Sequence, residues 1–181
     1  MNKSSQKHPA QKFSVWAAVL TVALSCFRIG LAAGSHGDVR FEDVTESLGL
    51  SPGNGRATWA DLDGDGWPDL IVGGRIWKNI EGQRFEDVTE ASGLERLRGS
   101  CVVADFTGNG TNDIYGVGGG GALYIGVGNM RFEKGSAEAH AFVAQAAAAA
   151  DLDNDGWVDL YVANYEIWKD QVDFPDLMLR N

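Results

Sequence analysis

Short apolar runs separated by loops of acidic residues and glycine alternate along much of this chain. In the clearest copy, the apolar runs predict strands near 57–62, 69–73, 75–79 and 84–89. The runs are short and rich in strand-forming residues, and the alternation of apolar and polar residues in FEDVT is typical of a strand with one polar face. The pattern therefore predicts an all-β fold built from units of four short strands.

This four-strand unit repeats. Asp61, Asp105 and Asp151 open matching acidic loops, 44 and 46 residues apart. The segment FEDVTE at 41–46 returns at 85–90, and a degenerate copy, RFEKG, begins at Arg131. A period of about 45 residues with four strands per unit is typical of the blades of a β-propeller.

The repeats predict a partial propeller. We expect a propeller segment over 39–181, with blades near 56–90, 99–135 and 144–181. The segment 40–46 matches a fourth strand without a blade of its own, and the third blade lacks its fourth strand. Because three blades cannot close a ring, we expect an open arc. A longer natural product, or self-association through the open blade edges, would then cover the exposed faces.

Two segments allow a second interpretation. Helix propensity favours a helix for AQAAAAA at 144–150, but the repeat register places it as the first strand of the third blade. GVGGGG at 116–121 could be taken for a phosphate loop, but no Lys-Ser/Thr follows it, so we expect a turn before a strand at 122–125. A short helix over 136–142 is possible, and His140 within it is expected to be a surface residue rather than a catalytic one.

The acidic loops have the spacing of a cation site. In the first loop, carboxylates occupy positions 1, 3, 5 and 9, glycine occupies position 6, and position 7 offers a backbone carbonyl. Alternate side chains of a tight loop point inward, and the glycine permits a positive φ. Oxygen-only ligands suit calcium before magnesium. The candidate ligands are Asp61, Asp63, Asp65, Trp67 and Asp69; Asp105, Thr107, Asn109, Thr111 and Asp113; and Asp151, Asp153, Asp155, Trp157 and Asp159.

Two alternatives to such a site follow from the same residues. A plain solvated turn also uses Asp and Gly, although three copies in one register favour a repeated site. An EF-hand would need flanking helices and a glutamate at position 12, where this chain has Val72, Gly116 and Val162. The second loop has fewer charges than the other two, so we expect it to bind calcium most weakly.

Residues 1–33 are expected to form an export signal. Three lysines precede an apolar stretch over 13–24, which is too short to span a membrane comfortably, and the small residues Ala32 and Ala33 follow. The alternatives are a short membrane anchor and lipid attachment at Cys26. Export would make the protein secreted, periplasmic or attached to the cell surface, with no membrane span in the mature chain.

The charge balance excludes one class of partner. The 181 residues carry a formal charge of −10, and residues 1–33 contain four basic residues and no acid, which leaves −14 on the remainder. A protein this acidic is not expected to bind nucleic acid through phosphates. Cys101 is the one cysteine in that remainder, so no internal disulfide is expected there. Its apolar surroundings predict an unreactive, buried thiol.

The DxDxDGxxDL loops, the strand pairs around them and the FEDVT strands resemble the FG-GAP or VCBS-type repeat. That repeat builds the β-propeller of integrin α chains and of many secreted bacterial proteins. The combination of FEDVTE and DGWxDLYVANY is closest to ASPIC-type secreted proteins, similar to cartilage acidic protein. The resemblance covers 41–181 and implies that the loop aspartates bind calcium. The Phe-Gly…Gly-Ala-Pro motif is absent, so the adhesive role of integrins is not implied, and family members commonly have seven blades.

These features predict an exported, calcium-stabilised propeller protein without enzymatic activity. Its expected role is binding or adhesion at a cell surface or matrix, with an extracellular protein or glycan as the ligand. The alternative is the propeller portion of a secreted polysaccharide-active enzyme or phospholipase whose catalytic part lies beyond Asn181. Trp67 and Trp157 could stack on sugars, or they could pack as lids over their own turns.

Overall fold

The computed structural model describes residues 39–181 except for 96, 98, 119–120, 137–143 and 165–173. Residue contacts divide the chain into two units, Met1–Phe41 and Glu42–Asn181. The expected export signal with Cys26, and the possible helix with His140, lie outside the described residues. No helix in the described part of the chain is long and apolar enough to cross a membrane.

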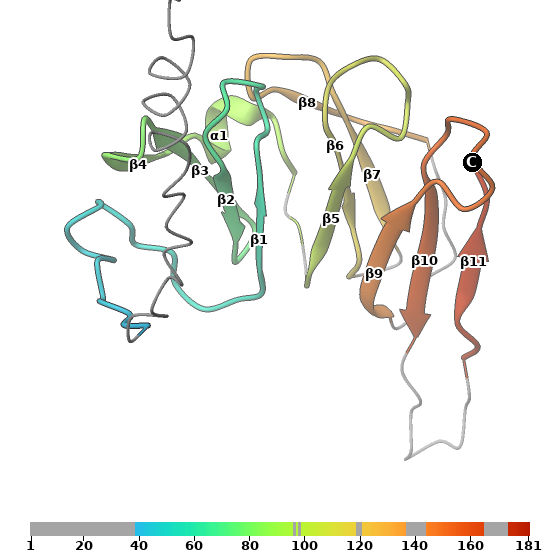
Figure 1. Cartoon of the computed structure of the whole chain (residues 1–181), viewed down its shortest axis with the longest axis horizontal. Helices are drawn as coiled ribbons and strands as arrows, with labels where there is room; N and C mark the ends of the chain where they lie inside the picture. Colours follow the sequence, from blue (N-terminus) through green and yellow to red (C-terminus); the bar gives the residue numbers. More distant parts are fainter. Residues whose placement is uncertain (1–38, 96, 98, 119–120, 137–143, 165–173) are drawn as a thin grey trace, which may run out of the picture. The chain divides into compact units, whose positions relative to one another are not determined.

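The unit Glu42–Asn181 contains three antiparallel sheets in its described residues (Figure 1). In each sheet the strands follow one another in chain order. The first sheet has β1 (Ala57–Ala60), β2 (Asp69–Val72), β3 (Arg75–Ile80) and β4 (Arg84–Asp87). The second has β5 (Cys101–Ala104), β6 (Asp113–Gly116), β7 (Ala122–Gly126) and β8 (Phe132–Lys134). The third has β9 (Ala144–Ala150), β10 (Asp159–Asn164) and β11 (Leu177–Leu179). The all-β prediction is confirmed.

The alanine-rich segment is a strand, as the repeat register predicted. β9 pairs with β10 at every residue except Gln145, where the register shifts, and Ala149 lies opposite Leu160 and Ala147 opposite Val162. Ala147 and Ala149 pack with those residues in one apolar cluster. Cross-strand pairing and packing therefore outweigh the helix propensity of alanine.

The predicted strand over 40–46 does not form. Residues 39–44 have no regular structure, and a turn follows over 45–49. The Leu48 amide donates to the Val44 carbonyl at 3.0 Å, and the side chain of Phe41 is 96% exposed. A strand requires a partner edge for its amides and carbonyls, whereas this segment satisfies part of its backbone within its own turn.

The second copy of FEDVT is also a shorter strand than predicted. β4 ends at Asp87, because the Asp87 carboxylate accepts hydrogen bonds from the amide and hydroxyl of Thr89. A one-turn helix, α1 (Thr89–Ser92), begins there. In the first copy, Asp43 accepts the Thr45 amide at 3.0 Å in the same way. The repeated Asp-Val-Thr sequence therefore ends an extended segment and starts a turn.

The apolar core lies between the sheets. Ile71 and Ile76 of the first sheet form one cluster with Ile114 and Tyr124 of the second. A further cluster joins the opposite face of the second sheet to the third, through Tyr115, Val117, Leu160 and Val162. On the other face of the first sheet, Leu70 and Trp77 pack with Leu48 and Leu50 from the preceding turn. Sheets stacked in series in this way correspond to consecutive propeller blades.

Cys101 is half-buried beside the first of these clusters. Burial raises the pKa of its thiol, and a hydrogen bond with Thr58 opposes that shift without cancelling it. A raised pKa lowers the thiolate fraction and hence the reactivity of the thiol, in agreement with the predicted unreactive cysteine.

Candidate metal centre

The three acidic loops each join the first two strands of a sheet. We call residues 61–68 loop one, 105–112 loop two and 151–158 loop three; they connect β1 to β2, β5 to β6 and β9 to β10. All three lie at the same end of their sheets, which is the upper end of each sheet in Figure 1. The flanking elements are strands, as predicted, and not the helices of an EF-hand.

Loop positions 4 and 6 have a left-handed backbone in every copy. At position 6 the φ angles of Gly66, Gly110 and Gly156 are 88°, 82° and 94°. Glycine adopts this conformation without steric cost, which confirms its predicted role. Asn154 at position 4 has a φ of 58°, and Asn is among the residues that best tolerate this region.

The aspartate at position 1 holds the loop backbone. Asp61 accepts the Gly66 amide at 2.9 Å and the Gly64 amide at 2.8 Å. Asp105 accepts the Gly110 amide at 2.9 Å, and Asp151 accepts the Gly156 amide at 3.0 Å. The same bond therefore closes the turn in all three loops.

Position 5 forms a second repeated bond, to the amide of position 7. Asp65 accepts the Trp67 amide and Asp155 accepts the Trp157 amide, both at 2.9 Å. In loop two the neutral side chain of Asn109 accepts the Thr111 amide at 2.8 Å. The backbone at this position requires an acceptor oxygen but not a charge.

The aspartate at position 9 is a buried cross-link between strands. Asp69, Asp113 and Asp159 are only 0%, 0% and 3% exposed. One carboxylate oxygen accepts an amide from early in the loop, and the other accepts an amide at the third strand of the sheet. The donors are Leu62 and Asn79 to Asp69, Thr107 and Gly126 to Asp113, and Leu152 and Asn181 to Asp159.

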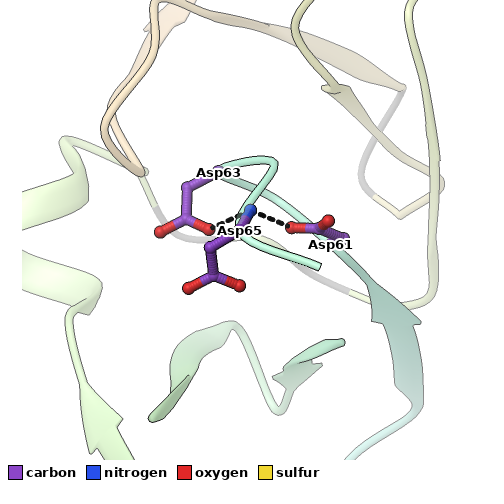
Figure 2. Close-up of side chains that lie close together, drawn as sticks. All are labelled: Asp61, Asp63 and Asp65. Atoms are coloured by element: carbon purple, nitrogen blue, oxygen red, sulfur yellow. Dashed lines mark hydrogen bonds between the residues drawn. The ribbon is translucent and has the colours of Figure 1, made fainter. Parts of the chain in front are cut away.

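Loops one and three gather three carboxylates each. One oxygen from each of Asp61, Asp63 and Asp65 lies within 4.8 Å of the others, and Asp151, Asp153 and Asp155 meet the same limit. Figure 2 shows the first triad around the Asp65 amide, which donates to Asp61 and Asp63. The buried aspartates at position 9 are not members of these triads.

Loop two has a different position 3. Thr107 donates its hydroxyl to Asp113 at 3.0 Å, and Asn109 donates its side-chain amide to the Gly126 carbonyl at 3.1 Å. Thr111 donates its hydroxyl to the same carbonyl. Loop two therefore has neutral, hydrogen-bonded side chains at positions 3 and 5, whereas the other loops have carboxylates there.

Two basic side chains, which the sequence analysis did not identify, contact the triads. Lys78 of β3 forms ion pairs with Asp63 and with Asp65, the latter at 3.1 Å. Arg180, which follows β11, lies 3.2 Å from Asp153. The sequence signal for both residues is the alignment of IWKN at 76–79 with MLRN at 178–181, because each segment has a basic residue before asparagine.

The local electrostatics differ between equivalent carboxyls. The Trp67 amide, followed by Lys78, lowers the pKa of Asp65. Burial raises the pKa of Asp69 and outweighs its bonds from Asn79 and Leu62. In loop three, the amides of Asn181 and Leu152 lower the pKa of Asp159. At the same sequence position, burial therefore dominates the pKa of Asp69, whereas the donated amide bonds dominate the pKa of Asp159.

The two loop tryptophans pack against glycines and keep part of their surface exposed. The Trp67 ring lies 3.0 Å from the point where a Cβ on Gly82 would stand, and the Trp157 ring lies 2.9 Å from the equivalent point on Gly108. The tryptophans are 42% and 47% exposed. Trp67 therefore covers the β3–β4 hairpin of its own sheet, whereas Trp157 of loop three covers loop two.

Hydrogen bonds also connect loops one and two to the sheet that follows each of them. Asn112 of loop two donates its side-chain amide to the Asp61 carbonyl at 2.6 Å. Asn181, after β11, donates in the same way to the Phe106 carbonyl at 2.6 Å. The loops are consequently part of the contact between neighbouring sheets.

The donor chemistry of loops one and three fits calcium. The triads offer carboxylate oxygens only, and hard cations such as calcium prefer oxygen ligands in flexible arrangements. Asp61, Asp63 and Asp65 would hold the ion in loop one, and Asp151, Asp153 and Asp155 would hold it in loop three. The carbonyls of Trp67 and Trp157 are the further candidates from the sequence, together with the buried aspartates at position 9.

Comparison with protein families gives a match over part of the chain. A family model described as an FG-GAP-like repeat matches residues 105–162, from the start of loop two into β10. The match supports the repeat family that the loop and strand motifs resemble, and such repeats suggest an integrin-like β-propeller protein. A comparison with curated proteins found no match. The chain is thus an all-β repeat protein with an FG-GAP-like repeat.

Proposed function

We propose that this chain is an exported calcium-binding propeller protein whose role is binding or adhesion, not catalysis, at a cell surface or matrix. Loops one and three hold the calcium ions in this proposal, and loop two is a weak site. The ligand of the surface is an extracellular protein or glycan. The observation that carries the calcium assignment is the contrast between loop two and the other loops.

Loop two shows that the loop fold does not require the extra carboxylates. It forms the position 1 and position 5 bonds with Asp105 and a neutral Asn109, and its position 9 bonds with Asp113. Loops one and three make the corresponding bonds while adding two carboxylates each. Like charges held this close repel one another, so the added carboxylates destabilise the loops unless a cation compensates them.

The proposed location and role rest on other observations. The basic, apolar and small-residue pattern over 1–33 supports export, and FG-GAP repeats are typically extracellular. The motifs shared with ASPIC-type secreted proteins support the same location. The half-exposed rings of Trp67 and Trp157 offer flat apolar surface beside the loops, which suits a protein or glycan ligand.

Loop two also supplies the variants for the test. Asp63→Thr with Asp65→Asn gives loop one the residues of loop two at positions 3 and 5, and Asp153→Thr with Asp155→Asn does the same for loop three. The bond from position 5 is kept in each case. Calorimetric titration of the full chain should show two strong calcium sites, each double variant should remove one, and the combined variant should remove both.

Melting temperatures give an independent measurement. At a hundredfold excess of calcium over its dissociation constant, each site stabilises the folded state by about 2.7 kcal/mol, which raises the melting temperature by several degrees. The combined variant should melt at the same temperature with calcium and with chelator. Identical melting of the unaltered chain under both conditions, together with no heat of titration, would show that the loops are bare turns.

A further inference from the structure

A basic side chain reaches the acidic loop in the first and third sheets, and an apolar side chain replaces it in the second sheet. Lys78, Ile125 and Arg180 occupy equivalent places, because each precedes the residue whose amide donates to the position 9 aspartate. Those donors are Asn79 to Asp69, Gly126 to Asp113 and Asn181 to Asp159. The strand register agrees, since Lys78 pairs with Glu86 and Ile125 pairs with Glu133 in the repeated fourth strand.

The basic residue and the carboxylate triad occur together. Loop one has its triad and Lys78, loop three has its triad and Arg180, and loop two has Thr107, Asn109 and Ile125. The side chain at this place in the third strand therefore matches the charge of the loop beside it. Its ammonium or guanidinium group supplies positive charge at the carboxylates where a bound cation would also lie.

We propose that Lys78 and Arg180 are tethered cations that compete with calcium for the two triads. The inference rests on the calcium-binding function proposed above and adds a determinant of affinity to it. Without calcium, the basic side chain offsets the repulsion among the carboxylates and keeps the loop folded. Binding of calcium displaces the side chain, so its ion pairs must be given up and the apparent affinity falls.

The surroundings of Lys78 allow this displacement. Lys78 and Asp63 line an open pocket of about 250 Å³, together with residues of α1 and of the β7–β8 hairpin, including Ala91 and Asn129. Lysine carries its charge at the end of a flexible stem. The ammonium group can therefore leave the carboxylates by rotation within this pocket, without disturbing the packed sheet.

The two tethered cations are not equally strong competitors. Lys78 contacts two carboxylates, its side chain is 26% exposed, and its partner Asp63 is 11% exposed. Arg180 contacts one carboxylate, with exposures of 66% for the arginine and 33% for Asp153. Exposed ion pairs contribute little, so Lys78 should compete more effectively. Loop one should therefore bind calcium more weakly than loop three, although their triads are the same.

The test uses the whole 181-residue chain, and one loop is studied at a time. In the Asp153→Thr/Asp155→Asn background, Lys78→Met should raise the calcium affinity of loop one by roughly tenfold, as expected from the loss of hydrogen bonds between charged groups. It should also lower the melting temperature in chelator. Lys78→Arg should restore both properties, and Arg75→Met is the matched control, because Arg75 pairs with Asp87 outside the loop.

Loop three provides the second half of the test. In the Asp63→Thr/Asp65→Asn background, Arg180→Met should change the calcium affinity by less than Lys78→Met changes it in loop one. Calcium affinities and melting temperatures are both recorded, so a variant that folds poorly is recognised by its melting in chelator and by the Lys78→Arg comparison.

The outcomes separate this inference from the calcium function itself. The two double variants that serve as backgrounds are the parent proteins. If the parent proteins bind calcium and Lys78→Met leaves the calcium affinity unchanged or weakens it, the competition is refuted and the calcium function stands. If a parent does not bind calcium but its Met variant does, the competition is supported in its strongest form. If neither parents nor variants bind calcium, the proposed function fails and the competition fails with it.

Discussion

Loop one and loop two share their backbone hydrogen bonds and differ in their charges. Both use an aspartate at position 1 to hold the glycine at position 6, and a buried aspartate at position 9 to join the loop to the third strand. Loop one adds two carboxylates and the ammonium group of Lys78, and loop two has neither. The difference teaches that the loop fold and the loop charge are separate properties of the repeat.

The largest expected effect is at position 9, where the two loops agree. Asp113→Ala leaves the amides of Thr107 and Gly126 without their acceptor, and each buried donor left unsatisfied costs about 1–3 kcal/mol. Urea unfolding should show a loss of at least about 2 kcal/mol, equal with calcium and with chelator.

The matched control for position 9 is Asp105→Ala in the same loop. Asp105 also accepts two amides, but these bonds are exposed, so water can replace the carboxylate and the loss should be smaller. Equal losses from the two variants would contradict the assignment of Asp113 as the buried cross-link that carries the loop fold.

An intermediate effect is expected when the charge of loop one is transferred to loop two. Thr107→Asp with Asn109→Asp should lower stability in chelator by about 1 kcal/mol, because new carboxylates gather beside Asp105 and the hydroxyl bond from Thr107 to Asp113 is lost. Differential scanning calorimetry should show a melting temperature that rises more with calcium than that of the unaltered chain.

Addition of Ile125→Lys to that variant sharpens the comparison. The new lysine occupies the place of Lys78 in the first sheet, so it should restore part of the stability in chelator and reduce the response to calcium. If the acidic loop two is as stable in chelator as the unaltered chain, the repulsion that supports the calcium proposal is too small to matter.

The smallest effect is expected at Asp87, which lies in β4 of the first sheet and outside the acidic loops. Burial of Asp87 acts to raise its pKa, but its bonds from the hydroxyl and amide of Thr89 outweigh burial and lower the pKa below its usual 3.8. A lowered carboxyl pKa stabilises the fold above about pH 3.8, and that contribution is lost as the pH falls through the folded pKa.

Asp87→Asn should therefore reduce stability at pH 7 and change it little at pH 2. The difference should stay below about 1 kcal/mol, because the Asp87 side chain is 36% exposed and solvent screens its interactions. Chemical unfolding at the two pH values measures it, with Asp43→Asn as the control for the same bond outside a sheet. A larger loss at pH 2 than at pH 7 would contradict the sign of the shift.

The sequence by itself determined the elements and their order. Period and register located the strands, including the alanine-rich β9, because repeated units of a chain form the same local structure when they pack against one another. The backbone conformation of the loop glycines was also predicted from the sequence, because Gly66, Gly110 and Gly156 have the positive φ that their position requires. These features depend on backbone geometry and on local spacing, which a sequence records directly.

Only the tertiary structure decided what the polar side chains contact. Asp69 resembles the other loop aspartates in sequence, yet it is buried and bonds to the amide of Asn79, ten residues away. Lys78 reaches loop one because β3 pairs beside β2, and Trp157 covers Gly108 because loop three packs on loop two. The segment 40–46 has a sequence typical of a strand but does not pair as one. Each of these outcomes depends on a neighbour brought close by sheet pairing and packing, and residue spacing alone does not specify that neighbour.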